Sequence, residues 1–106
     1  MNPKVSTVLA EVREGLRAIY GEDLAGVYLY GSCARGEEGP ASDLDVVVIL
    51  PEVRDPWEEI QRTSEMKGSL SLRHDVSLSF YFVSRSAWDN EESPFLDNVR
   101  REAVGP

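Results

Sequence analysis

One segment organises the whole chain: Gly31-Ser32-Cys33-Ala34-Arg35-Gly36-Glu37-Glu38-Gly39-Pro40-Ala41-Ser42-Asp43-Leu44-Asp45. The residues before it, 27–30, alternate aliphatic and tyrosine side chains and predict a β-strand. The residues after it, 45–50, are rich in β-branched side chains, predict a second strand, and are stopped by Pro51. The segment therefore joins two strands, with a turn at its start and two carboxylates at its end.

The first half of the segment favours an anion. Gly31 lets the backbone turn sharply and approach a ligand closely, and Ser32 offers both its hydroxyl and its N–H group. If residues 33–36 form a helical turn, the free N–H groups of that turn point at the same place and suit a phosphate. Arg35 adds a positive charge that would contact the phosphate or, equally well, take part in a surface salt bridge.

The second half of the segment favours a metal ion. Asp43 and Asp45 are two residues apart, so on a strand their side chains leave the same face, with Cα atoms roughly 7 Å apart. Two carboxylates held so close repel each other unless a cation lies between them. Mg²⁺ prefers carboxylate and phosphate oxygens, so it would satisfy both halves of the segment.

The composition describes an ordinary globular protein of one domain, residues 1–106. Its single cysteine excludes an internal disulfide, and we find neither an apolar run long enough to span a membrane nor a signal peptide, so a cytoplasmic location is expected. The net charge of −8 disfavours direct binding of nucleic acid and makes a divalent cation necessary for binding a triphosphate. Solubility alone explains that charge equally well.

Periodicity places the elements that surround the segment. A helix is expected from Pro3 to about Tyr20, because apolar residues recur there at spacings of three and four. A second helix should begin at Pro56 and end near Gly68, with inward residues Trp57, Ile60 and Met66. A third strand is expected over 74–83, where Val76, Leu78, Phe80 and Phe82 form the packed face. The last helix begins at Pro94, with Phe95, Leu96, Val99 and Ala103 available for packing.

The central segment resembles the signature of the DNA polymerase β-like nucleotidyltransferases, and among them the minimal nucleotidyltransferase (MNT) proteins. The shared pattern is Gly-Ser, ten residues, then Asp-x-Asp, which here is Gly31-Ser32 followed by Asp43-Leu44-Asp45. Residues 34–36, Ala-Arg-Gly, and Ser42 also agree with the family's common pattern. The resemblance implies an α/β (α+β) nucleotidyltransferase fold, a small mixed β-sheet backed by helices in a single domain.

The resemblance also implies a third carboxylate, on a strand that follows an intervening helix. Asp75 is the acid in that context, and it lies on the polar face of the strand expected over 74–83. The other candidates have plainer interpretations. His74 is expected to be structural, Cys33 an inert thiol, and Trp57 and Trp88 core residues rather than surfaces that stack on a nucleobase.

These residues together imply metal-dependent nucleotidyl transfer. Asp43, Asp45 and Asp75 would be both the catalytic residues and the ligands of two Mg²⁺ ions, while Gly31, Ser32 and Arg35 would hold the phosphates of ATP. Asp75 would also help to deprotonate the hydroxyl that attacks the α-phosphate. The expected product is an acceptor that carries AMP.

The length of the chain constrains the acceptor, since the sheet and the central segment use nearly all of the 106 residues. The acceptor or the rest of its site should come from another chain, which would also cover Val47 and Ile49 on the face of the aspartates. The resemblance implies an MNT antitoxin that transfers AMP to a tyrosine of a HEPN ribonuclease toxin. Two alternatives remain: a binding protein that neutralises its partner by occlusion without turnover, and a small-molecule nucleotidyltransferase that acts as a dimer.

Overall fold

The computed structural model describes residues 3–31 and 43–105. Their helices and strands follow one another in the order α1 (Pro3–Tyr20), η1 (Gly21–Asp23, a 3₁₀ helix), β1 (Gly26–Tyr30), β2 (Asp43–Leu50), α2 (Pro56–His74), β3 (Ser77–Ser84), α3 (Arg85–Asn90) and α4 (Pro94–Glu102). Within these residues, no helix has the length and apolarity that a membrane crossing requires.

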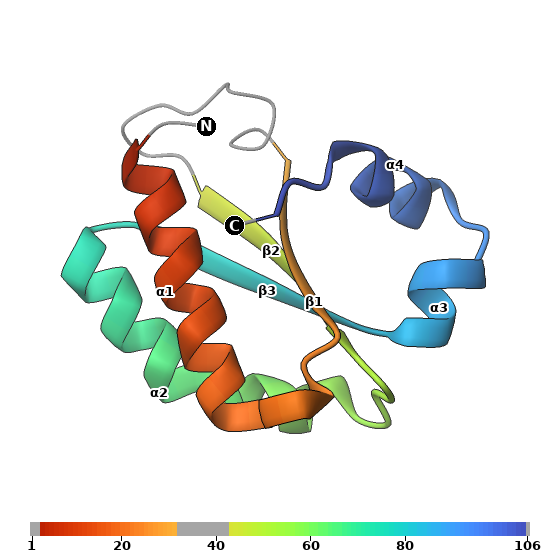
Figure 1. The fold of residues 1–106 in the computed structure, drawn as a ribbon, viewed down its shortest axis with the longest axis horizontal. Helices are drawn as coiled ribbons and strands as arrows, with labels where there is room; N and C mark the ends of the chain where they lie inside the picture. Colours follow the sequence, from red (N-terminus) through yellow and green to blue (C-terminus); the bar gives the residue numbers. More distant parts are fainter. Residues whose placement is uncertain (1–2, 32–42, 106) are drawn as a thin grey trace.

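A mixed three-stranded sheet forms the centre of the fold, with β2 between the other two strands. β1 pairs antiparallel with β2, and β2 pairs parallel with β3. Helices cover both faces, so that α1 and α2 lie on one side of the sheet and α3 and α4 on the other (Figure 1). This is the small mixed sheet backed by helices that the sequence predicts.

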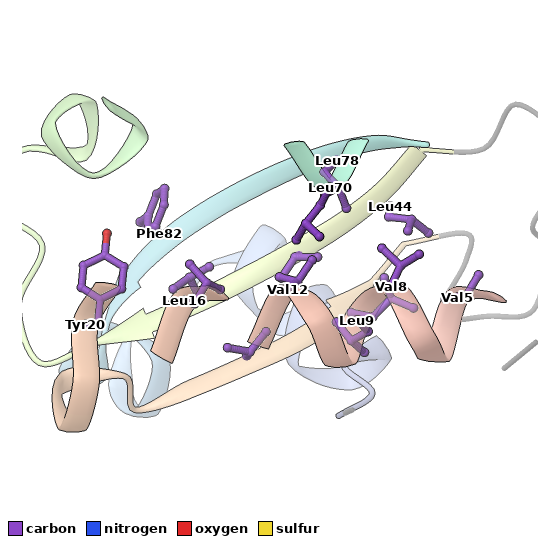
Figure 2. Close-up of a cluster of buried hydrophobic side chains, with 14 of the residues drawn as sticks. Val5, Val8, Leu9, Val12, Leu16, Tyr20, Leu44, Leu70, Leu78 and Phe82 are labelled. Carbon is purple, nitrogen blue, oxygen red and sulfur yellow. The ribbon is translucent and has the colours of Figure 1, made fainter. Parts of the chain in front are cut away.

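The larger core lies between the sheet and the pair α1 and α2. Figure 2 shows Val8, Val12 and Leu16 of α1 pointing toward the strands, where the side chains of Leu78 and Phe82 meet them. The apolar stripe of α1 is therefore confirmed as its buried face. Its spacing of three and four residues places these side chains on one side of the helix, which can then lie flat on the sheet.

The smaller core lies on the opposite face of the sheet, between β2 and α4. Val47 and Ile49 pack there against Leu96 and Val99 of α4 and against Val83 of β3. The expectation that a partner chain covers Val47 and Ile49 is wrong, because the chain's own C-terminal helix buries them. Ser93 caps α4 by accepting a hydrogen bond from the N–H of Leu96 at 3.0 Å, which sets where this helix begins.

Helix α2 runs six residues further than expected, and of its three predicted inward residues only Met66 packs against the core. It begins as predicted, with the side chain of Asp55 accepting a hydrogen bond from the N–H of Trp57 at 3.1 Å, but it continues past Gly68 to His74. Thr63 and Leu70 are buried, whereas Trp57 is 62% exposed and Ile60 38% exposed. Burial of Leu70 against the larger core outweighs the low helix propensity of Gly68, so the helix persists.

The longer α2 shortens the strand that follows it. β3 begins at Ser77 rather than at His74, because residue 74 ends the helix and Asp75 takes the left-handed conformation that terminates it, with φ of 52°. The packed face of β3 is as predicted, since Leu78 and Phe82 are buried and Phe80 packs against the same core. The short helix α3 after Ser84 was not expected from the sequence.

Candidate active site

The two aspartates of the central segment open strand β2 and share one face of the sheet. Asp43 is exposed and Asp45 half-buried, while Leu44 between them is buried in the larger core on the other face. Asp45 lies opposite Tyr30 of β1, and on the other side opposite Ser79 of β3. The predicted pairing of the two carboxylates on one face is therefore the geometry that the structure has.

The surroundings of Asp45 disfavour its charge. Burial raises the pKa of its carboxyl above the ordinary value, and the neighbouring charge of Asp43 raises this pKa further. A cation placed between the two carboxylates would offset both effects, because it attracts the ionised forms that burial and mutual repulsion penalise.

Asp45→Asn should raise the melting temperature of the metal-free protein by up to a few degrees, since two like charges roughly 7 Å apart cost about 0.6 kcal/mol in water and more at a half-buried site. The gain should be larger at pH 7 than at about pH 3. Because the pKa of Asp45 is raised on folding, its carboxyl costs no stability while protonated, and the cost appears as the pH rises through the folded value. Thermal unfolding of the wild type and Asp45→Asn at the two pH values, with a chelator present, measures the gain in melting temperature. An equal gain at pH 7 and at about pH 3 would contradict the role of the Asp45 charge.

Gly31 closes the site at the end of β1. Its φ of +80° lies in the left-handed region that favours glycine. A Cβ atom at this position would lie 2.8 Å from Oδ2 of Asp45, so a side chain would collide with the carboxylate. The absence of a side chain therefore allows the turn and also lets the backbone pass directly beside Asp45.

Aromatic residues border the acids on the same face of the sheet. Tyr30, the cross-strand neighbour of Asp45, has a raised pKa, first because of burial and then because of the charge of Asp45. Its ring meets Phe95 edge to face at 6.3 Å between centroids, and Phe95 meets Tyr81 of β3 in the same way at 5.1 Å. These rings make one side of the acid pair aromatic.

The structure places Asp75 at the end of α2, where its backbone terminates the helix, and not on the polar face of β3. The predicted strand position is therefore wrong, although Asp75 stays two residues before Ser77, the partner of Asp43 across the parallel pair. Among the described residues, no group of three or more His, Cys, Asp or Glu side chains is arranged to hold a metal ion. Asp75 therefore does not complete a metal-holding cluster with the pair.

Ser32, Cys33 and Arg35 lie outside the described residues, and so do the phosphate contacts that the sequence predicts for Ser32 and Arg35. The chemistry of the acids that are described fits Mg²⁺, since Asp43 and Asp45 offer hard oxygen ligands on one face and repel each other without a cation. Substrate phosphates and water commonly complete the coordination of such an ion.

The remaining candidates lie away from the acids or serve the fold. His74 contacts Glu11 of α1 through Nε2 and Oε2 at 2.7 Å, as expected for a structural histidine. Trp88 stacks on Tyr28 with ring centroids 5.7 Å apart, so its prediction as a packing residue is confirmed. Trp57 is exposed, and the prediction that it is a core residue is wrong.

One acid beside the site was not predicted. Glu102, the last residue of α4, accepts a hydrogen bond from the N–H of Gly31 through Oε2 at 3.1 Å. The sequence offers no motif for this contact, because the two residues are 71 positions apart. The signal in the sequence is that a helix beginning at Pro94 is long enough to bring Glu102, which follows Arg100 and Arg101 at its C-terminal end, back to the sheet.

Comparison with known proteins agrees with the geometry. The family model described as "Nucleotidyltransferase domain" matches residues 9–95. The chain is 25% identical over 101 residues to the Methanocaldococcus jannaschii protein named "Putative protein adenylyltransferase MJ0141", a match that spans 95% of this chain and 97% of the relative.

Solved structures share the fold. A structure described as a "putative minimal nucleotidyltransferase" superposes with a TM-score of 0.61 at 25% identity and covers 96% of this chain and 95% of its own. A toxin–antitoxin crystal structure with AMP-PNP superposes with a TM-score of 0.66 at 18% identity and covers 91% of this chain and 69% of its own.

Proposed function

The chain belongs to the nucleotidyltransferase domain family, and on that premise we propose that it transfers AMP from ATP to a hydroxyl group on a partner protein. The observation that supports the proposal most strongly is the arrangement of Asp43 and Asp45 on one face of the sheet, directly beside the turn at Gly31. Transfer at an α-phosphate uses carboxylates that hold a divalent cation. It also needs space for the phosphates, which the missing side chain at Gly31 provides.

Each residue has a role in the proposed reaction. Asp43 and Asp45 would hold Mg²⁺, which when bound neutralises charge on the triphosphate and polarises the phosphorus that is attacked. Gly31 lets the phosphates approach the backbone, and Ser32 and Arg35 are proposed to bind them. Asp75 does not form a metal-holding group with the pair among the described residues, so the role proposed for it is to take up the proton of the attacking hydroxyl.

A protein acceptor is proposed for two reasons. The relative named "Putative protein adenylyltransferase MJ0141" is matched over 97% of its length, and the acceptor that its name gives is a protein. One structural neighbour is a toxin–antitoxin structure with AMP-PNP. We propose that this chain acts in the same setting, as an MNT antitoxin that modifies a HEPN-type toxin in the cytoplasm.

Labelled ATP tests this proposal directly. The protein is incubated with Mg²⁺ and the product of the adjacent gene, once with ATP labelled at the α-phosphate and once with ATP labelled at the γ-phosphate. AMP transfer should label the neighbour from the α-position only, and Asp43→Ala should abolish the labelling. Neutralisation of the neighbouring gene's product without label would favour a binding protein that acts by occlusion. Label on a small molecule would favour a small-molecule nucleotidyltransferase that acts as a dimer.

The contribution of Asp75 can be separated from its role in ending α2. Asp75→Asn keeps a residue that tolerates the left-handed conformation but removes the charge, and it should slow transfer by about a hundredfold, as expected for loss of a general base. Asp75→Gly should slow transfer equally while raising the free energy of unfolding by about 0.5–1 kcal/mol, because glycine is favoured at this position. Transfer rates and urea unfolding measure the two effects. Normal transfer by both variants would restrict Asp75 to the helix end.

A further inference from the structure

The carboxylate of Glu102 meets the turn at Gly31 from the side opposite to β2. Two hydrogen bonds of 2.8 Å join Leu29 of β1 to Val104, each backbone N–H donating to the other residue's carbonyl oxygen. This antiparallel bridge lies on the outer edge of β1, whose other edge pairs with β2. In an antiparallel register, Gly31, two residues after Leu29, lies opposite Glu102, two residues before Val104. The register of the bridge therefore brings Glu102 to the turn.

Two parts of the fold hold the bridge in place. Leu96 and Val99 anchor α4 in the smaller core, on the face of the sheet where Asp43 and Asp45 lie. The chain then leaves α4 at Glu102 and passes along β1 to Val104 (Figure 1). Glu102 is therefore fixed at both ends, by a packed helix before it and by paired backbone after it.

Glu102 and Asp45 approach Gly31 from two directions. Oε2 of Glu102 lies 3.1 Å from the nitrogen of Gly31. Oδ2 of Asp45 lies 2.8 Å from the position that a Cβ atom added to Gly31 would take. Since the nitrogen and Cβ of one residue are about 2.5 Å apart, the two carboxylate oxygens are no more than about 8.4 Å from each other. The family match ends at residue 95, so Glu102 lies beyond the part of the chain that the family model describes.

We propose that Glu102 is a positioning residue for nucleotide binding, which acts by holding the N–H of Gly31 and so fixing the turn beside Asp45. A hydrogen bond to a charged acceptor is among the stronger ones in proteins, and it constrains a residue whose glycine backbone is otherwise free to rotate. The inference rests on the proposed nucleotidyl transfer. It assigns the orientation of the turn to the hydrogen bond between Gly31 and Glu102, which the family's motif does not include.

Two variants separate positioning from the negative charge of Glu102. Glu102→Ala removes both the acceptor and the charge, whereas Glu102→Gln removes the charge but keeps an oxygen that can accept from Gly31. If Glu102 positions the turn, the alanine variant is impaired and the glutamine variant resembles the wild type. If Glu102 instead opposes the phosphates by its charge, both variants bind nucleotide more tightly than the wild type.

The test uses the full chain and two measurements. Amide hydrogen exchange of Gly31, followed by NMR, should be slow in the wild type and Glu102→Gln and at least about tenfold faster in Glu102→Ala. Calorimetry with Mg²⁺ and the α,β-methylene analogue of ATP should show affinity reduced about tenfold to hundredfold in Glu102→Ala, the range of a charged hydrogen bond, and restored in Glu102→Gln. Glu92→Ala, which removes an exposed acid just before α4, should change neither measurement.

Each outcome decides between the two proposals. Nucleotide affinity of Glu102→Ala equal to that of the wild type, or tighter binding by both variants, would overturn the positioning role and leave nucleotidyl transfer intact. A wild-type protein that binds no analogue would overturn the proposed function and this role with it. Equally fast exchange of Gly31 in the wild type and Glu102→Ala would show that the contact does not hold the turn.

Discussion

Asp43→Asn should reduce AMP transfer by about a thousandfold or more while leaving the protein folded. The paired carboxylates are the described groups best placed to hold a divalent cation. Loss of the cation's charge stabilisation raises the free energy of the transition state by several kcal/mol. Asparagine has nearly the same shape as aspartate, and it lowers the repulsion that raises the pKa of Asp45. The rate of label transfer from α-labelled ATP measures the loss, and thermal unfolding measures the retained stability.

The matched control for Asp43→Asn is Asp23→Asn. Asp23 is an exposed acid in η1, just before the end of β1 that pairs with Ile49, whereas the acids lie at the other end of the same strand pair. The same chemical change there should leave transfer within about twofold of the wild type. If Asp43→Asn retained more than about a tenth of the wild-type rate, the acid pair would not be the metal site.

Gly31→Ala should reduce transfer by about a hundredfold or more and also destabilise the protein. The left-handed conformation at Gly31 costs a residue with a Cβ atom about 1–2 kcal/mol, and the new Cβ would lie 2.8 Å from Oδ2 of Asp45. Either the turn or the carboxylate must move, and a displacement of about 1 Å in a reacting group is enough for a loss of this size. Transfer rates, together with the free energy of unfolding in urea, test both parts.

Gly68→Ala is the matched control, because it makes the same chemical change inside α2. Nothing lies within 4 Å of the Cβ that would be added there, and alanine favours a helix more than glycine does. This variant should gain up to about 1 kcal/mol of stability and keep full activity. A Gly31→Ala protein as active as Gly68→Ala would mean that the close approach at Gly31 does not serve the reaction.

Local patterns predicted most of the elements and the acid pair. The spacing in residues 3–20 predicted α1 and its buried stripe, and the alternation in β1 predicted that Val27 and Leu29 lie on one face and Tyr28 on the other, although not that both faces are covered. The pairing of Asp43 and Asp45 on one face follows from their separation by a single residue on a strand. Each of these predictions depends on backbone periodicity within one element, which is a property of neighbouring residues.

The errors at the end of α2 and over Val47 and Ile49 concern contacts between elements distant in the sequence. α2 continues through Gly68 because Leu70 reaches the core, and this extension moves Asp75 from a strand to a helix end. Val47 and Ile49 are covered by α4, which begins more than forty residues later. Whether a helix persists past a glycine, or returns to cover a sheet, depends on burial that no local pattern records.

The order of the residues alone predicts two strands joined by the segment that begins at Gly31-Ser32, with carboxylates at a spacing that suits a divalent cation. Folding in three dimensions adds Glu102 to the far side of Gly31, turns Asp75 into a helix terminus and buries the aliphatic residues behind the acids. The difference has one physical cause. Backbone geometry repeats over a few residues and is visible in the sequence, whereas hydrogen bonds and packing across 71 positions exist only once the strands have paired and the helices have docked.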